Sequence, residues 1–266
     1  MHPPQPQFQP NHLIIICCHA IYLGGPTNGL DEREWLIEPF QRGETPTFTN
    51  HVKAGIRMLD GDPAGLLVFS GGATKRSRTE LTEAESYLNL AKDNNYFSLR
   101  PDSECSNTFG IDSSRITAET LATDSYQNVL FSILHFRLHT GTYPSRVTVV
   151  THEFKRERFV ECHFPAIGLD PGRVGVVGIN PPEEVTPRRE LVKGEEERGI
   201  GPWRRDRYGV GAELAGKRMK RGWVAGMERT YFLDFGLEVV EELVCWDGGG
   251  GNEVFPRLRE LPWYRK

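Results

Sequence analysis

The feature that most constrains this chain is a set of short apolar segments with little or no polar alternation. Leu13 to Cys18 reads Leu-Ile-Ile-Ile-Cys-Cys, and Leu66 to Phe69 and Val147 to Val150 have a similar character. A strand with one face in water alternates apolar and polar residues, whereas a strand buried on both faces does not. These segments therefore predict strands in the interior of a parallel sheet.

Segments with helical periodicity separate these strands. Helices are predicted over Asn50–Leu59 with Thr49 as cap, Glu80–Lys92, Asp124–Leu138 and Lys155–Phe164, and further strands over Arg115–Ala118 and Val174–Ile179. Strands that alternate with helices imply right-handed crossovers between parallel neighbours. The expected fold class is α/β with a mostly parallel sheet.

The chain changes character after about residue 182. We expect a disordered Pro/Gln-rich tail over residues 1–11, an α/β domain over 12–182, and a C-terminal extension over 183–266 packed on that domain. Within the extension, Gly209–Trp223 reads as a basic helix, and Glu238–Trp246 reads as a helix or a late strand. Residues 97–108 are expected to be irregular.

Composition and charge exclude several classes of protein. Lys and Arg number 32 against 36 Asp and Glu, so the net charge of −4 argues against a general nucleic-acid binder. No apolar run approaches the roughly 20 residues that cross a bilayer. The five cysteines lack C-x-x-C spacing, which indicates neither a disulfide framework nor a zinc site. We expect a cytoplasmic protein without a membrane span.

Unusual polar residues follow the predicted strands. They are His19, Ser70-Gly71-Gly72, Glu119 and Thr151-His152. In open parallel sheets, ligands bind outside the carboxyl ends of the strands, so these residues predict a functional site. Glycine at positions 71 and 72 would let a ligand approach the backbone amides, next to the N-terminus of a helix. The alternative is an ordinary strand-to-helix turn.

Two cations follow the strand that ends at Thr151. Lys155 and Arg158 lie in the first turn of the predicted helix, where positive charge opposes the helix dipole. Helix stability does not explain them, so they predict a grip on an anionic ligand, with Arg158 able to hold two oxygens. The alternative is a solvated basic face that they share with Arg156.

Candidate acid–base groups lie in the same region. Glu80, Glu83 and Glu119 could act as a general base, a metal ligand or a hydroxyl acceptor, although carboxylates at helix N-termini are also good caps. His19 is a candidate acid–base group by position and intrinsic pKa. Ser125 and Asn128 share one helix face, where Asn usually has a ligand or a loop backbone as partner.

Taken together, these motifs resemble the SanA/YdcF-like family, also called domain of unknown function 218, in the form seen in fungi. The matching residues lie between Leu13 and Asn180: the strand ending in Cys18-His19-Ala20, then Phe69-Ser70-Gly71-Gly72 with Glu83-Ala84, then Glu119 with Ser125 and Asn128, and finally Thr151 with Lys155 and Arg158. Lys155 stands where the family motif TS-x-x-H-x-x-R has its histidine. The resemblance implies a Rossmann-like three-layer fold and nucleotide-like or S-adenosylmethionine-type ligands.

Three functional hypotheses follow. The first is a protein that binds a small anionic or nucleotide-like ligand, acting as a hydrolase or transferase, with His19, Glu83 and Glu119 as catalytic groups. Its ligand-binding residues would be Ser70, Gly71, Gly72, Glu80, Ser125, Asn128, Thr151, His152, Lys155 and Arg158. The second is a non-catalytic regulatory or interaction protein that uses the basic helix at Lys217 to Arg221. The third is metal-assisted chemistry at Glu119, His152 and His19. The sequence leaves the cofactor unknown, and no metal ligands are assigned.

Overall fold

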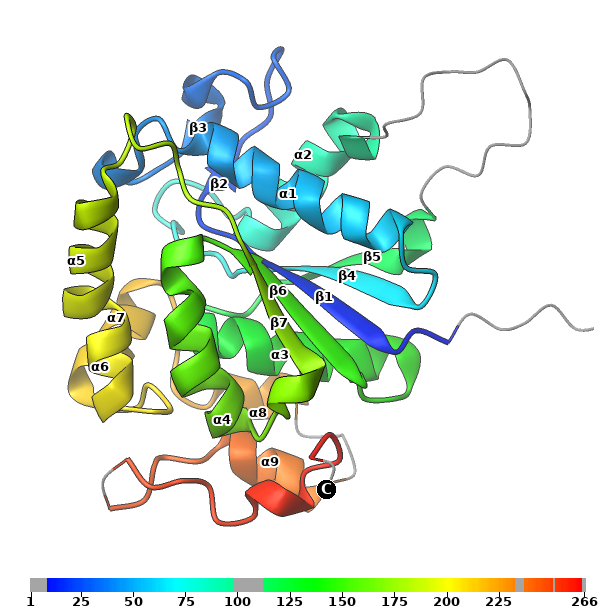
Figure 1. Cartoon of the computed structure of the whole chain (residues 1–266), viewed down its shortest axis with the longest axis vertical. Helices are drawn as coiled ribbons and strands as arrows, with labels where there is room; N and C mark the ends of the chain where they lie inside the picture. The colour runs from blue at the N-terminus through cyan, green and yellow to red at the C-terminus, as the bar shows by residue number, and fades with distance from the viewer. Residues whose placement is uncertain (1–8, 98–111, 233–236, 251, 265–266) are drawn as a thin grey trace, which may run out of the picture.

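Five parallel strands form the centre of the molecule in the computed structural model, which describes residues 9–97, 112–232, 237–250 and 252–264 (Figure 1). The strands are β1 (His12–Cys17), β4 (Gly65–Ser70), β5 (Ile116–Glu119), β6 (Arg146–Thr151) and β7 (Val174–Gly178). Their order across the sheet is β5-β4-β1-β6-β7, so β1 lies in the middle. It pairs with β4 on one side and with β6 on the other.

The uninterrupted apolar run of β1 is buried on both faces of the sheet, as predicted. Leu13 and Ile15 contribute to one hydrophobic cluster, and Ile14 and Ile16 contribute to the other. None of these four side chains is exposed. Each buried aliphatic side chain of this size stabilises the fold by roughly 1.5–3 kcal/mol, so the central strand contributes to both halves of the core.

Helices cover both faces of the sheet. On one face lie α1 (Thr45–Asp60) and α2 (Glu83–Asp93), and on the other lie α3 (Ser125–Thr140) and the short α4 (Phe164–Ile167). The sheet is thus the middle of three layers (Figure 1). This arrangement confirms the α/β class and the three-layer Rossmann-like fold.

The C-terminal segment shares the core on the α3 side. Its helices are α5 (Arg188–Arg198), α6 (Ile200–Arg205), α7 (Ala212–Lys220), α8 (Met227–Phe232) and α9 (Glu238–Val244). Trp203, Tyr208 and Leu243 belong to the same hydrophobic cluster as the β1 side chains on that face. The segment from Glu238 is a helix, which decides between the two alternatives that the sequence left open.

Several helices begin elsewhere than predicted. The first begins at Thr45 because Pro46 fits the first helical turn, so Thr49 lies inside the helix and does not cap it. The second is capped by Thr82, whose hydroxyl accepts from the Glu85 amide while the Glu85 side chain accepts from the Thr82 amide. Glu80 therefore lies before this helix rather than in it.

The segment after β6 also differs from the predicted α-helix. A single 3₁₀ turn covers Glu153–Lys155, and a π-helical stretch follows over Arg158–His163. π-Helical turns are rare and often occur at functional sites, because the extra residue rotates the side chains that follow it.

Two further observations complete the fold. A small antiparallel pair, β2 (Ile21–Tyr22) and β3 (Trp35–Leu36), lies beyond the end of β1. Within the described residues, no helix combines the length and apolar character that a membrane span requires. Most of the predicted tail, and the irregular segment at 98–108, lie outside the described residues.

Candidate functional site

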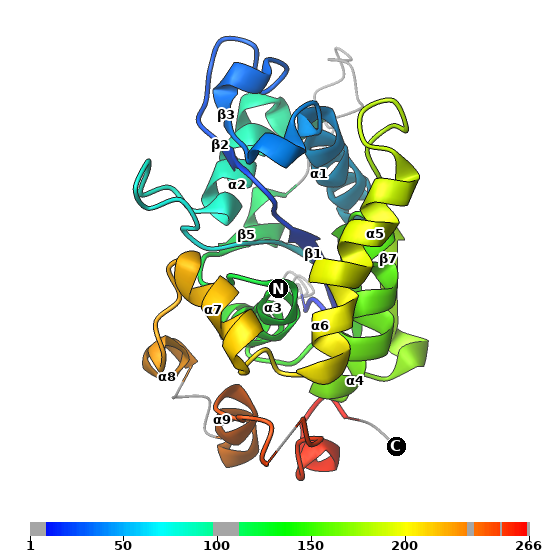
Figure 2. The ribbon, with the colours of Figure 1, turned by 90° about the vertical axis from the view of Figure 1, so that its left-hand side faces the viewer.

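The carboxyl ends of β1, β4 and β6 lie side by side at one edge of the sheet. Cys17 pairs with Ser70 across β1 and β4, and Ile16 pairs with Val150 across β1 and β6. The residues that follow these strands are therefore neighbours in space. Figure 2 looks onto this edge, with α5 and α6 on one side and α7 on the other.

Ser70, Glu119 and Asn128 form a closed network beneath this edge. The Ser70 hydroxyl donates to Glu119 Oε2 at 2.6 Å, and Asn128 Nδ2 donates to the Ser70 carbonyl at 3.0 Å. The other Glu119 oxygen accepts from the amides of Leu121 and Ala122. Ser70 is 0% exposed and Glu119 is 2% exposed. These three residues position the ends of β4 and β5 through hydrogen bonds within the chain.

Burial raises the pKa of Glu119 to about 7, although the hydrogen bonds from Ser70 and the two amides act in the opposite direction. The carboxyl group is therefore close to half protonated at neutral pH.

The sequence left two kinds of partner open for Asn128, a ligand or a buried backbone segment. In the structure its side chain donates a hydrogen bond to the backbone of β4, so the backbone partner is the one observed.

The backbone amides of Gly71 and Gly72 are not available to a ligand, contrary to the prediction. The Gly71 amide donates to the Glu119 carbonyl at 3.0 Å, and the Gly72 amide donates to the Ala122 carbonyl at 2.7 Å. The two glycine carbonyls accept from the first amides of α2. A Cβ atom on Gly71 would lie 2.9 Å from Glu83 Cβ and 3.2 Å from Cys18 Cβ, so close packing explains this glycine.

The two helix-proximal glutamates have different environments. Glu80 is exposed in the loop before α2. Glu83 is partly buried, and its Oε1 accepts from the Thr74 hydroxyl at 2.6 Å. Burial raises the pKa of Glu83, while the hydrogen bond from Thr74 and the charges of Arg221, Lys75 and Lys155 lower it. The structure thus brings Glu83 but not Glu80 into the site.

Three histidines cluster beyond β1 and β6. The ring of His152 lies 4.5 Å from that of His19 and 4.9 Å from that of His51. His51 comes from α1 and was not predicted from the sequence, because it lies among core residues such as Phe48 and Val52 on the apolar face of that helix. Burial is the main cause that lowers the pKa of all three rings, so they are neutral at neutral pH.

His152 lies against Glu44, a second residue that the sequence did not single out. Its Nε2 is 3.9 Å from Glu44 Oε2. Burial raises the pKa of the Glu44 carboxyl group, although the positive charge of Lys155 also acts on it and lowers the pKa. The residue is 3% exposed, and neither ring nitrogen has a hydrogen-bond partner among the described residues. Its ring packs among those of His19, His51 and Phe154.

Lys155 is the central cation of the site. Its Nζ lies 3.4 Å from His19 Nδ1, and His19 Nε2 lies 3.4 Å from the hydroxyl of Thr151. Within residues 9–97, 112–232, 237–250 and 252–264, no carboxylate oxygen lies within ion-pair distance of this amine. Burial, and then the charge of Arg158, lower the pKa of Lys155 to about 8. The side chain keeps partial exposure to solvent.

Arg158 is already engaged, which alters its predicted role as a bidentate anion clamp. Its Nε donates to Glu195 Oε1 at 2.7 Å, and its Nη2 forms an ion pair with the other oxygen of Glu195. Its Nη1 donates to the Ser125 hydroxyl at 3.2 Å, and that hydroxyl lies 2.8 Å from His163 Nε2. Glu195 belongs to α5, so the C-terminal segment completes this part of the site.

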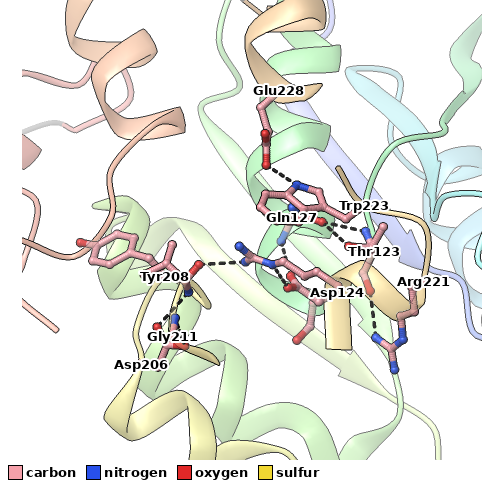
Figure 3. A network of polar contacts seen from close by, with 12 residues as sticks. Thr123, Asp124, Gln127, Asp206, Tyr208, Gly211, Arg221, Trp223 and Glu228 are labelled. Atoms are coloured by element: carbon pink, nitrogen blue, oxygen red, sulfur yellow. Dashed lines mark hydrogen bonds and ion pairs between the residues drawn. The ribbon is translucent and has the colours of Figure 1, made fainter. Parts of the chain in front are cut away.

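The basic helix α7 also reaches the strand ends. Arg218 is 4% exposed, forms an ion pair with Asp124 and donates to the Tyr208 carbonyl at 2.8 Å. Arg221 follows the helix and donates to the Thr123 carbonyl at 2.8 Å, within the polar network shown in Figure 3. Two of the basic side chains are thus used inside the chain rather than on a solvated face.

Metal-assisted chemistry at Glu119, His152 and His19 finds no support in this geometry. Among the residues that the structure describes, no three His, Cys, Asp or Glu side chains are placed to hold a metal ion. Glu119 accepts a hydrogen bond from Ser70 at the ends of β4 and β5, while the rings of His19 and His152 pack against each other after β1 and β6.

Comparison with known proteins identifies one distant relative. The uncharacterised yeast protein YOR238W (Saccharomyces cerevisiae) is 24% identical over 250 residues, which cover 79% of this chain and 82% of the yeast protein. No protein-family model matches the sequence, and no solved structure matches it. The resemblance to the SanA/YdcF-like family therefore stays a prediction, and this relative brings no assigned activity to the site.

Proposed function

We propose that this chain binds a small anionic or nucleotide-like molecule at the carboxyl ends of β1, β4 and β6. The observation that carries the proposal is the amine of Lys155. A partly buried lysine without a carboxylate partner is unfavourable in the free protein, and burial is reflected in its lowered pKa. An anionic ligand supplies the missing negative charge.

A second cation supports the same assignment. Arg221 approaches from the C-terminal segment, and its charge and that of Lys155 both act on Glu83. No carboxylate oxygen in the described parts of the chain lies within ion-pair distance of the Arg221 guanidinium. Arg158 and Glu195 neutralise each other, so Lys155 and Arg221 are the cations of this site that form no ion pair among the described residues.

We further propose hydrolysis or group transfer as the reaction, with Glu83 and His19 as the acid–base groups. Glu83 is a partly buried carboxyl group whose pKa is raised, and His19 is a neutral imidazole beside the cation. A carboxyl group with a raised pKa can donate a proton nearer neutral pH, and a neutral imidazole has a ring nitrogen that can accept one. Glu119 would act through position only, since it is buried and bound to Ser70.

A thermal-shift screen tests ligand binding. Nucleotides, S-adenosylmethionine and phosphorylated metabolites should include compounds that raise the melting temperature, because a ligand at 100 times its Kd stabilises the folded state by about 2.7 kcal/mol. Lys155→Met should abolish the shift. Lys193→Met is the matched control, because Lys193 lies exposed on α5 and its side chain is 75% exposed.

The proposal fails if no compound of these classes stabilises the protein, or if Lys155→Met responds as the unmodified chain does. Retention of binding in Arg158→Ala would be consistent with the pairing of Arg158 to Glu195, and would place the anion on Lys155 and Arg221.

The alternative of an interaction protein that uses the basic helix has less support. Arg218 is buried in an ion pair, and Arg221 is held by the Thr123 carbonyl. Lys217 forms an ion pair with Glu213 at 3.0 Å. Among the basic side chains of α7, this leaves Lys220 exposed to solvent without an ion pair to a described residue.

A further inference from the structure

The amine of Lys155 has neighbours that an electrostatic role alone does not require. We propose that Lys155 is a nucleophile that forms an imine with a carbonyl compound carrying an anionic group. This inference rests on the proposed function, because the cations of the same site must hold the anionic group. It adds a covalent step and narrows the ligand to an aldehyde or ketone.

A proton acceptor lies beside the amine. An ammonium group only donates hydrogen bonds, so His19 Nδ1, 3.4 Å from Lys155 Nζ, must be the unprotonated nitrogen of a neutral ring. The ring proton is then on Nε2, which faces the Thr151 hydroxyl at 3.4 Å. This tautomer leaves Nδ1 free to take a proton from Lys155.

The surroundings also favour the free amine. Burial and the nearby guanidinium of Arg158 lower the pKa of Lys155 to about 8. At pH 7, about one molecule in ten then carries the amine without its proton, whereas for an ordinary exposed lysine the fraction is below about one in a thousand. Desolvation and a neighbouring cation are the arrangement that activates lysine as a nucleophile.

The step balances without an external reagent. Lys155 loses a proton to His19 Nδ1, and its lone pair attacks the carbonyl carbon while the C=O π electrons move to oxygen. The oxygen gains a proton, which Glu83 can supply because burial keeps its pKa raised. The nitrogen, which is positively charged after the attack, returns one proton to the Glu83 carboxylate and becomes the neutral carbinolamine. Its lone pair then breaks the C–O bond, and the oxygen leaves as water with the proton returned by His19. The sum is ammonium plus carbonyl to protonated imine plus water.

The anionic group of the substrate would lie toward Arg221. That guanidinium belongs to the residue after α7, and its charge and that of Lys155 both act on Glu83. A carbonyl compound with a carboxylate or phosphate would thus place its carbonyl carbon at Lys155 and its negative charge between the two cations.

Reductive trapping tests the inference. The full chain is treated at pH 7 with sodium cyanoborohydride and either formaldehyde or glyoxylate, and the modified lysines are located by peptide mass spectrometry. Cyanoborohydride reduces each imine to a stable alkylated amine, which is secondary after one reaction and tertiary after a second reaction with formaldehyde. We expect Lys155 to react at least about tenfold faster than exposed lysines, since its larger free-amine fraction outweighs its lower basicity. Glyoxylate should show a stronger preference for Lys155 than formaldehyde does.

Matched variants distinguish a nucleophilic role of Lys155 from a purely electrostatic one. Lys155→Arg keeps the positive charge and should remove the fast adduct, while Lys193→Arg removes one exposed lysine of α5 and should leave it unchanged. His19→Gln should slow the reaction severalfold. The rate at Lys155 should reach half its maximum near pH 8, as its own titration requires. The titratable and charged groups that face Lys155 are His19, His51, His152, Glu44, Glu83, Glu195, Arg158, Arg221 and Cys17.

The two probes distinguish failure of the covalent step from failure of ligand binding. Fast formaldehyde labelling of Lys155 without a glyoxylate preference would support the imine step and overturn anion binding at this site. If an anionic compound stabilises the protein but Lys155 reacts no faster than exposed lysines, the inference is wrong and the proposed function stands. Slow labelling without any stabilising ligand would overturn both.

Discussion

The charge of Lys155 should cost the free protein stability. Its pKa is lowered in the folded chain, so the folded state binds this proton more weakly than the unfolded state, and stability is lost as pH falls through about 8. Lys155→Met should therefore raise the free energy of unfolding at pH 7 by about 1–2 kcal/mol, less than the full pKa shift implies because the side chain keeps some exposure. Urea denaturation measures this change.

The same comparison at pH 10.5 provides the control. At that pH the amine is neutral in the folded chain and about half protonated in the unfolded chain, so most of the advantage of the methionine variant should disappear. If Lys155→Met is instead less stable than the unmodified chain at pH 7, the charge of Lys155 is already neutralised in the folded protein and the prediction is wrong.

Glu119 should give an opposite pH dependence. Its pKa is raised to about 7 in the folded chain from an ordinary value of 4.5, so its contribution to stability is complete below about pH 4.5 and is lost as pH rises through 7. Glu119→Gln removes this titration and keeps the size of the side chain. The free energy of unfolding of the variant relative to the unmodified chain should increase by about 3 kcal/mol between pH 4.5 and pH 8.

Urea unfolding at several pH values measures this difference, and the buried histidines cancel because both proteins contain them. Parallel stability curves for the two proteins would show that Glu119 is ionised at neutral pH in spite of its burial.

At residue level, the sequence located the site better than it assigned the roles. The alternation of buried strands and polar ends placed His19, Thr151 and Lys155 together, because strand ends in a parallel sheet share one edge. It could not show that the amides of Gly71 and Gly72 are already bonded, since their acceptors lie about 50 residues away at Glu119 and Ala122.

Among the secondary-structure elements, the contact between the π-helical stretch and α5 depends on one ion pair. The side chains of Arg158 and Glu195 are only 14% and 7% exposed. Glu195→Ala leaves a partly buried guanidinium without its partner and should destabilise the fold by about 3 kcal/mol. The double variant Arg158→Met/Glu195→Leu should recover much of this loss, because an apolar pair replaces the charges.

A double-mutant cycle by chemical denaturation measures the coupling between the two side chains. If each single variant costs less than about 0.5 kcal/mol and their effects add, the ion pair does not hold the two elements together.

The sequence predicted which elements exist more reliably than where they begin. The helix over α1 was placed at Asn50 because Thr49 resembles a cap, whereas Pro46 allows the helix to begin one turn earlier. The π-helical stretch at Arg158–His163 has no signature in periodicity, because its extra residue is set by the partners of Arg158 and His163 in α5 and α3.

For the whole molecule, the C-terminal segment should be required for folding. Its aromatic side chains, including Trp203 and Tyr208, belong to the hydrophobic cluster that covers the α3 side of the sheet. A chain that ends at Pro187 would expose this apolar surface to water and should lose cooperative unfolding. Near-UV circular dichroism and urea denaturation detect this loss, and a sharp two-state transition would instead show that residues 1–187 fold independently.

The overall architecture was predictable because it depends on local apolar runs, and the packing of the C-terminal segment was not. Residues such as Trp203 and Leu243 show that the segment has apolar side chains, but their partners on α3 and the sheet are distant in sequence. The same limit hid Glu195, Glu44 and Arg221 as contributors to the site.

The central place of β1 has a consequence for synthesis on the ribosome. Its pairing partner β6 begins at Arg146, more than 130 residues after the start of β1 at His12. At translation rates of about 5–20 residues per second, the Leu13–Cys17 segment waits roughly 7–27 seconds before that partner has been made. During this interval an apolar strand edge is exposed, so the nascent chain should be a client of ribosome-associated chaperones until β6 has emerged.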